Sequence, residues 1–468
     1  MLPHSIKHQT LPTSNKWPMS SLKVKSKFKV KTSLSLTIPT VYRFTWPTIP
    51  VRYAFRFLAS RIFIVLALLT GFQRFLEKAT GIGAFSKVDE LMLVFVLGCF
   101  FLLGMIRSRL NGILVMTTLL LSYIVVISLL FGVNKSIPVI LLQGLVHLKF
   151  FFFISFVMVF FEPGDRLIRR SFRIFVMVAV AGYIFQLLSP TLFQNLFNVI
   201  PNTRRGELRY GGIIHTNQFS LLLSSIYIIW LARNFHKSSW RKVVAYALLF
   251  SLLIMINGSR TALVGVVLPV FILYRRQIFT KRVMRLFLFA GALGFILVYT
   301  STDLIQRTAT NVGDMFNPES KYIRGILIYY GVVLSIWYFP IGSGAATYGS
   351  LLSANSVIYD QLGIGDNYYI VNEKGTYDSN FASIMGEFGV LGFLLFYLLL
   401  RKLFRRLKNT MHLQAHRQLM HAIYVVIFFY LVSNPIFMNS LASLIFVWVL
   451  SIIVLNVNED VKQADRLS

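Results

Sequence analysis

The sequence predicts an all-α integral membrane protein, a polytopic helical bundle of about twelve transmembrane helices with one large extracytoplasmic loop that bears an amphipathic helix. Three observations predict this fold class. Hydrophobic residues make up 56% of the 468 residues and charged residues 14%, and the mean hydropathy is +0.67. Apolar runs recur that approach the roughly 20 residues a helix needs to cross a bilayer. Basic residues are concentrated in alternate connections between these runs.

Residues 1–52 are polar and basic, and they include the run LKVKSKFKVK at Leu22–Lys31. We expect this segment to be a disordered cytoplasmic tail close to anionic lipid headgroups. The first apolar stretch begins near residue 53, which is too late for a cleavable signal peptide. The single cysteine, Cys99, excludes a disulfide scaffold.

We expect transmembrane helices 1–9 within residues 53–300, helices 10–12 within residues 383–456, and a second cytoplasmic tail at 457–468. The connections on one side hold most of the arginines and lysines, for example Arg166–Arg173 and Arg401–Lys408, and those on the other side hold few. Because cytoplasmic connections are enriched in basic residues, both termini are expected in the cytoplasm. The individual spans are expected at 53–73, 90–106, 111–133, 139–161, 172–193, 212–232, 243–257, 261–275, 285–300, 383–400, 419–437 and 440–456.

Residues 301–382 are expected to form the large extracytoplasmic loop. Within this loop, Tyr322–Phe339 is apolar except for Arg324. A further span there would move the basic cluster Arg401–Lys408 to the outer side, so we expect an amphipathic helix on the outer surface instead. Loops of this length are usually functional or disordered, and the glycine-rich segment Ile341–Gly349 favours a folded lid.

Several functional classes are excluded. The formal net charge is +30, but the basic residues follow the membrane topology, so we expect no nucleic-acid partner. The chain contains no GxxxxGK[ST] phosphate loop, no DxD pair, no HExxH and no CxxC. The connections on the basic side are too short for a nucleotide-sugar domain. We therefore expect substrates to arrive from the membrane or from outside, without a bound metal or another cofactor.

Polar residues gather where the large loop re-enters the membrane, at Tyr377–Gly392. Asp378, Ser379 and Asn380 come directly before an apolar run, where acid and amide groups are costly unless they bind something. Asp378 is the candidate to position or deprotonate a sugar hydroxyl, and Ser379 and Asn380 are candidate binding residues. Glu387, inside the apolar run, is more simply explained as a buried structural carboxylate.

A second group of polar residues precedes the span at 212–232. Arg209 comes before a pair of glycines, and His215, Asn217 and Gln218 lie at the start of the apolar run. Such groups in a membrane must face protein, water or a ligand. We expect Arg209, His215 and Asn217 to line a substrate site, whereas Gln218 is equally well explained by hydrogen bonds between helices.

Two further arginines lie on the expected outer side. Arg260 falls in the first turn of a helix, where the helix dipole disfavours a cation. An anion bound at this helix end would be attracted both by the free backbone N–H groups and by the guanidinium group. A headgroup-anchoring arginine is the alternative. Arg324, with Arg307 and Lys321 nearby in the sequence, suits phosphate or pyrophosphate, although a solvated helix face is the alternative for Arg324.

These motifs resemble the O-antigen ligase and polymerase superfamily of bacterial envelope glycan assembly, over roughly residues 200–400 and, through the twelve-span plan, over most of the chain. Members often carry an arginine, a glycine and then H-P-N at the start of an outer span, and they also carry an R-x-x-x-L element and a P-x-G-x-G turn. Ligases further carry a histidine followed by Asn, Ser or Gln, then nine intervening residues, and then G-x-x-G. The matching positions are Arg209, Gly211 and His215-Thr216-Asn217, with Thr216 for proline; Arg260 with Val264 for leucine; Pro340, Gly342 and Gly344; and Asp378-Ser379 with Gly389 and Gly392.

Asp378 stands where ligases of the family carry histidine, so the resemblance favours the polymerase branch. It implies a multi-pass enzyme of the bacterial plasma (inner) membrane that polymerises polysaccharide repeat units. The implied donor is a growing glycan on undecaprenyl pyrophosphate, and the implied acceptor is a lipid-linked repeat unit. Besides this lipid-linked oligosaccharide and the bilayer, chain-length regulator and flippase proteins are implied partners.

The resemblance also implies roles for the candidate residues. Arg260 would stabilise the leaving pyrophosphate, together with Arg209 and Arg324, and Asp378 would act on the acceptor. Two alternatives stay open. One is a ligase that moves finished glycan to lipid A core or to protein. The other is a lipid-glycan flippase or another transporter, for which polar groups near the bilayer midplane and an internal repeat would be typical.

Overall fold

The structure is a computed structural model of the chain, all of whose described residues belong to the compact unit Thr48–Ser468. The N-terminal tail up to residue 48, the expected span at 285–300, Arg307, Lys321 and the tail from residue 458 lie outside the described residues. The described ranges are 49–106, 112–199, 202–204, 207–235, 237–257, 259–278, 323–372 and 375–457.

Helices make up nearly all of the described structure, and one short antiparallel hairpin joins Thr203 to Leu208. Every expected span except 285–300 coincides with a helix. The elements are α1 Ile49–Thr80, the 3₁₀ helix Gly83–Lys87, α2 Val88–Ile106, α3 Gly112–Phe131, α4 Ile137–Phe160, α5 Leu167–Leu188, α6 Pro190–Phe197, β1 Asn202–Arg204, β2 Glu207–Arg209, α7 Thr216–Asn234, α8 Trp240–Ile256, α9 Arg260–Ile278, α12 Ile323–Trp337, α13 Val357–Gln361, α14 Tyr368–Val371, α15 Asn380–Thr410, α16 Gln414–Ser433, and α17 Ser440–Ile452, which ends in a π-helical turn, Ile453–Val457.

Seven of the described helices are long and apolar enough to cross a membrane, namely α1, α3, α4, α5, α15, α16 and α17 with its π-helical turn. The predicted fold class, an all-α polytopic membrane protein, is confirmed. The count of about twelve stays a prediction, because α8 has only 17 residues and α7 carries Asn217 and Gln218 in its first turn.

Two of the expected boundaries differ from the structure because of a proline. The span expected at 172–193 is broken at Ser189, and α6 begins there with Pro190 at its first position. The span expected to reach residue 437 ends at Ser433, shortly before Pro435. The helices concerned, α5 and α16, therefore end earlier than expected.

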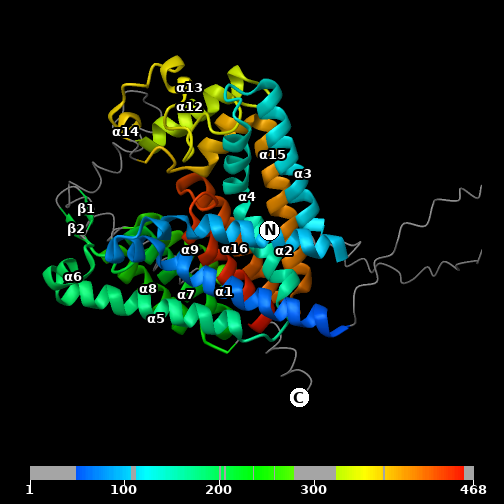
Figure 1. The fold of residues 1–468 in the computed structure, drawn as a ribbon. Coiled ribbons are helices and arrows are strands. Elements are labelled where there is room, and N and C mark those ends of the chain that lie inside the picture. Colours follow the sequence, from blue (N-terminus) through cyan, green and yellow to red (C-terminus); the bar gives the residue numbers. More distant parts are fainter. Residues whose placement is uncertain are drawn as a thin grey trace, which may run out of the picture. The chain divides into compact units, whose positions relative to one another are not determined.

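The amphipathic helix predicted in the large loop is α12, and it packs along α15, with α13 and α14 close by (Figure 1). Gly331 permits this packing, because a β-carbon there would come within 2.7 Å of the carbonyl oxygen of Ala382. One face of α12 is buried, while Ile336 and Trp337 are 66% and 59% exposed. At 15 residues, α12 is short for a membrane crossing.

The glycine-rich segment Ile341–Gly349 is folded and almost wholly buried against a kink in α15. The kink lies at Gly389, whose φ of 64° interrupts the helix. Gly342, with φ of 75°, approaches so closely that a β-carbon there would lie 2.4 Å from the amide nitrogen of Gly389. Both positions therefore require glycine.

Glu387 fastens this segment to α15. Its buried carboxylate accepts hydrogen bonds from the amide of Thr347 at 3.1 Å and from Ser350 Oγ at 2.6 Å. His147 Nε2, on α4, lies 3.1 Å from its other oxygen. The interpretation of Glu387 as a buried structural carboxylate agrees with these contacts.

Helix α17 is the most enclosed helix of the described chain, because every residue from Ser440 to Ile452 is buried. It contacts α1, α4, α5 and α7. Asn439 caps its first turn through a hydrogen bond of 3.0 Å from the amide of Ala442 to Oδ1. The start of α17 is thereby fixed at the floor of the cavity described next.

Candidate active site

A cavity opens where the first turns of α7, α9, α12 and α17 meet the loop before α15. It encloses about 800 Å³ of space, its open mouth included. Of the predicted site residues, it brings together His215, Asn217, Arg324 and Asp378. These residues come from three elements far apart in the sequence, so their convergence is a property of the fold.

Arg324 and Asp378 form an ion pair in the wall of this cavity, with Nε of Arg324 3.3 Å from Oδ2 of Asp378. Their side chains are 18% and 33% exposed. A pair this open to solvent adds less than about 1 kcal/mol to stability, so its importance lies in geometry. The contact uses one guanidinium nitrogen and one carboxylate oxygen. The other nitrogens of Arg324 can still bind an anion, and the other oxygen of Asp378 can still accept a proton or a hydrogen bond.

His215 is the N-cap of α7 and forms a reciprocal capping box with Gln218. Its Nδ1 accepts a hydrogen bond of 3.3 Å from the amide of Asn217. Because Nδ1 accepts, the proton of the neutral imidazole lies on Nε2, which makes that nitrogen a donor. The local sequence thus fixes both the position and the tautomer of His215.

Gln218 connects α7 to α17, because its Nε2 donates to Oδ1 of Asn439 at 2.9 Å. The interpretation of Gln218 as a residue that hydrogen-bonds between helices is confirmed. The same two residues also line the cavity. The bond therefore holds two of its walls together.

Arg260 is the first residue of α9, as the sequence predicted. Its side chain lies outside the described structure. Thr261, the next residue, lines the cavity together with Asp378. The N-terminus of α9 therefore opens onto the same cavity as the predicted catalytic aspartate.

Arg209 lines a neighbouring cavity of about 890 Å³, which shares Arg74 and His215 with the first. A third cavity, of about 1160 Å³, also shares these two residues and is lined in addition by Glu77 and Asp89. The three cavities are contiguous at Arg74 and His215. Arg209 thus lies next to the cavity of the ion pair, although it does not line it.

Ser379 and Asn380 line none of these three cavities. Ser379 is the N-cap of α15, where its hydroxyl accepts from the amide of Ala382 and donates to the carbonyl of Val432 at 2.8 Å. Asn380 accepts at Oδ1 from the amide of Phe437 at 2.9 Å. Both side chains are buried and hold the start of α15 against the last turn of α16 and the segment that follows it.

Sequence reasoning missed Arg74, which lines all three cavities. The sequence contained a signal for it: Arg74 follows a span expected to end at residue 73, on the side where arginines are rare. Asn434 and Asn439, which also line the first cavity, were missed because they lie in a short connection without a recognisable motif.

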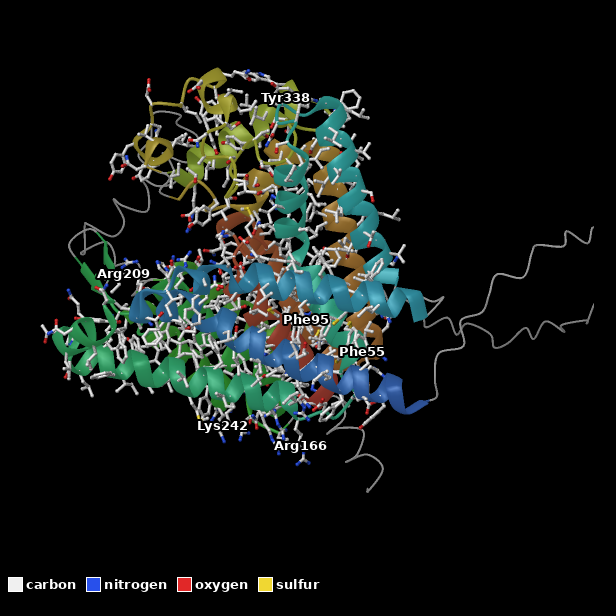
Figure 2. All side chains as sticks on the ribbon, in the orientation of Figure 1. Phe55, Phe95, Arg166, Arg209, Lys242 and Tyr338 are labelled. Atoms are coloured by element: carbon white, nitrogen blue, oxygen red, sulfur yellow. The ribbon has the colours of Figure 1, made fainter. Side chains whose placement is uncertain are left out.

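The basic connections lie away from this region. Arg166 and Lys242 lie at the starts of α5 and α8, while Arg209 lies beyond the other end of α5 (Figure 2). Arg209 is tied to that end through Gly211, whose amide donates to Gln186 Oε1 at 3.0 Å. Arg166 and Arg209 therefore lie toward opposite ends of α5.

Comparison with known families supports the motif-based resemblance. Residues 245–397 match the family model described as O-antigen ligase. The chain is similar to the O-antigen ligase and polymerase superfamily. Members of the O-antigen ligase family are membrane glycosyltransferase-like enzymes. The matched region contains Arg260, Arg324 and Asp378, and it ends before α16. No curated protein matches the chain.

Proposed function

We propose that the protein is a membrane glycosyltransferase that polymerises lipid-linked polysaccharide repeat units, of O-antigen, capsule or exopolysaccharide, at the outer face of the bacterial plasma membrane. One observation carries the proposal: the Arg324–Asp378 ion pair shares a cavity with His215, Asn217 and the first turn of α9. A cation beside a carboxylate, at the end of an apolar bundle, suits a substrate that joins a diphosphate to a sugar.

The cationic part of the site would bind the pyrophosphate of an undecaprenyl-linked glycan. Arg74 and Arg324 line the cavity, and Arg260 begins α9 beside it. Guanidinium groups pair bidentately with phosphate oxygens, and the free amides of a helix N-terminus add to the attraction. These groups would stabilise the negative charge that develops as the pyrophosphate leaves. Arg209, in the neighbouring cavity, would extend this surface.

The acceptor hydroxyl would be handled by Asp378. In the proposed step, the oxygen of an acceptor sugar hydroxyl forms a bond to the anomeric carbon of the donor, and the bond from that carbon to the pyrophosphate oxygen breaks. The hydroxyl proton passes to Asp378 or is held by it while the bond forms. Arg324 would fix the carboxylate in place, and His215 Nε2 and the Asn217 amide would hold sugar hydroxyls. Ser379 and Asn380 would contribute by positioning Asp378.

A ligase that transfers finished glycan to lipid A core or to protein is the second candidate, and the description of the matched family favours it. Asp378 favours the polymerase, because ligases of the family carry histidine at this position. A neutral histidine can both donate and accept a hydrogen bond, whereas an ionised carboxylate can only accept. The two differ in cells. Loss of a polymerase leaves single capped units, whereas loss of a ligase leaves uncapped core and accumulated polymer.

The direct test is elongation of a lipid-linked oligosaccharide by the purified protein. We expect wild-type protein to produce a ladder of longer chains and to release undecaprenyl pyrophosphate. Arg260→Ala is expected to slow elongation by about 100-fold or more, the typical loss when a stabilising group is removed from a developing charge. Wild-type elongation by Arg260→Ala at normal membrane levels would contradict the proposal.

A further inference from the structure

A second region of concentrated positive charge lies at the other end of α9 from the candidate active site. There, a cavity of about 470 Å³, its mouth included, separates the last turn of α9 from the end of α15 and the first two turns of α16. Arg275, Lys408, Arg417 and His421 line it, and no residue that lines it is acidic. The proposed glycosyl transfer does not use this cavity, and most of the residues that line it lie beyond the matched region 245–397.

Among the described residues, no carboxylate lines this cavity to balance its charge. Within the described part of the chain, no ion pair of 4 Å or less involves Arg275, Lys408 or Arg417. Arg417 is held in place, because its Nε donates to the carbonyl of Met411 at 3.0 Å. Three like charges around one small cavity repel one another unless an anion joins them.

The first turn of α16 adds to the positive potential. Its N-cap, Leu413, supplies no side-chain acceptor, and the first turn contains no acidic residue. The first amides of a helix carry a partial positive charge and need acceptors. They lie beside Arg417 and Gln414, which line the cavity. The basic side chains and the N-terminus of the 20-residue helix α16, which has no side-chain cap, therefore both face this cavity.

The surface beside the cavity carries exposed apolar side chains that could contact the acyl chains of a lipid. On α15, Leu394 and Leu398 are 47% and 38% exposed, and Arg401, Arg405 and Lys408 continue the same exposed face toward the cavity at a spacing of three to four residues. On α9, Phe271, one turn before Arg275, is 43% exposed. Because α15 is long and apolar enough to cross a membrane, we expect its leucines at acyl-chain depth and its basic residues at headgroup depth.

We propose that this cavity binds the phosphate headgroup of an anionic membrane lipid, with the acyl chains lying along the exposed leucines of α15. Arg275 and Lys408 supply the charge, and Arg417 with the first amides of α16 supplies directed donors. The apolar face selects a lipid over free phosphate. The site is independent of the proposed glycosyl transfer.

The test measures lipid binding to the purified full chain by native mass spectrometry in detergent, with phosphatidylglycerol as the probe. Phosphatidylcholine, which has a phosphate but no net charge, and inorganic phosphate are the comparison ligands. The test variant is Arg275→Gln/Lys408→Gln. The matched control is Arg166→Gln/Arg170→Gln, which removes the same charge from two exposed positions at the start of α5 that do not line this cavity.

We expect wild-type protein and the control to retain phosphatidylglycerol in preference to phosphatidylcholine. The test variant is expected to bind phosphatidylglycerol about 30-fold more weakly, the loss that two basic residues at an anionic surface represent. If that variant does not fold, Lys408→Gln, at an exposed position, is expected to weaken binding about fivefold. Arg275→Lys/Lys408→Arg keeps the charge and is expected to retain the lipid.

Three outcomes would overturn the proposal. Unchanged phosphatidylglycerol binding by the test variants would show that the cavity does not bind the headgroup. An equal loss in the control variant would show that only total charge matters. Displacement of the lipid by inorganic phosphate at similar concentrations would show that the site takes free phosphate instead of a lipid.

Discussion

Arg324 and Asp378 are separated by 54 residues in the sequence, yet the Nε of one lies 3.3 Å from the Oδ2 of the other. Arg324 lies in the first turn of α12, and Asp378 lies in the turn just before α15. The packing of α12 along α15 therefore produces the pair. In the proposed reaction this contact orients the carboxylate toward the acceptor hydroxyl.

Replacement of Asp378 by Asn tests that role. Asp378→Asn keeps the shape of the side chain but cannot accept a proton, so we expect elongation of a lipid-linked oligosaccharide to fall by at least about 100-fold. The control is Asp366→Asn, an exposed acid of the same loop that lines none of the described cavities. Equal chain lengths from wild-type protein and Asp378→Asn, at equal membrane levels, would remove Asp378 from the mechanism.

Arg74 is expected to contribute to donor binding, because it lines all three contiguous cavities. Arg74→Gln should lower elongation about 10-fold at limiting donor, the effect of losing one charge-assisted hydrogen bond of roughly 1.5 kcal/mol. Saturating donor should restore most of the rate. Arg61→Gln, an exposed arginine on the same helix, is the matched control and should elongate normally. A loss that excess donor does not relieve would speak against a binding role.

Glu387 is expected to be required for stability. Four of its hydrogen-bond partners act as donors: the amides of Thr347 and Tyr348, the hydroxyl of Ser350 and the side-chain amide of Gln143. In Glu387→Gln, an NH₂ group would face donors, and we expect a destabilisation of about 3 kcal/mol. Thermal unfolding of the purified protein measures it, with the exposed Glu162→Gln as control. An unchanged unfolding temperature would show that the carboxylate does not hold the segment.

Gly389 is expected to tolerate no side chain. Its φ is 64°, and a β-carbon would lie 2.4 Å from the carbonyl oxygen of Pro340. Gly389→Ala should therefore displace the glycine-rich segment from α15, with a loss of stability above about 1 kcal/mol and a loss of elongation. Gly98→Ala, in α2, adds a β-carbon where nothing lies within 4 Å, and should leave both properties intact. Similar behaviour of the two variants would contradict the structure at the kink.

Much of the helical plan could be predicted, because the apolar runs and the basic connections are strong local signals. α12 was predicted from one apolar run and the charge of the next connection, and α9 begins at Arg260 as expected. That His215, Asn217 and Asp378 share one site was expected through family motifs, whose order reflects a shared fold, and Arg324 was added because an arginine on the outer face suits phosphate. Local patterns carry no distance between segments, so the Arg324–Asp378 contact itself could not be predicted.

Other parts of the site gave no usable local pattern. Ser379 and Asn380 resemble binding residues by composition, but their hydrogen bonds go to Val432 and Phe437 in a distant segment. Arg74 was overlooked because it comes directly after a span whose end was placed at residue 73. The helix ends at Ser189 and Ser433 depend on nearby prolines, and hydropathy alone does not show where a proline ends a helix.

The close contact of Gly331 with Ala382 has a consequence for repeated rounds of the proposed reaction. Tyr348 adds a clamp, because its hydroxyl donates to the carbonyl of Leu327 on α12 at 2.9 Å. The helix that carries Arg324 and the start of α15, next to Asp378, are thus fastened together. In the proposed reaction, this attachment would let Arg324 and Asp378 keep their spacing through each round of chain extension.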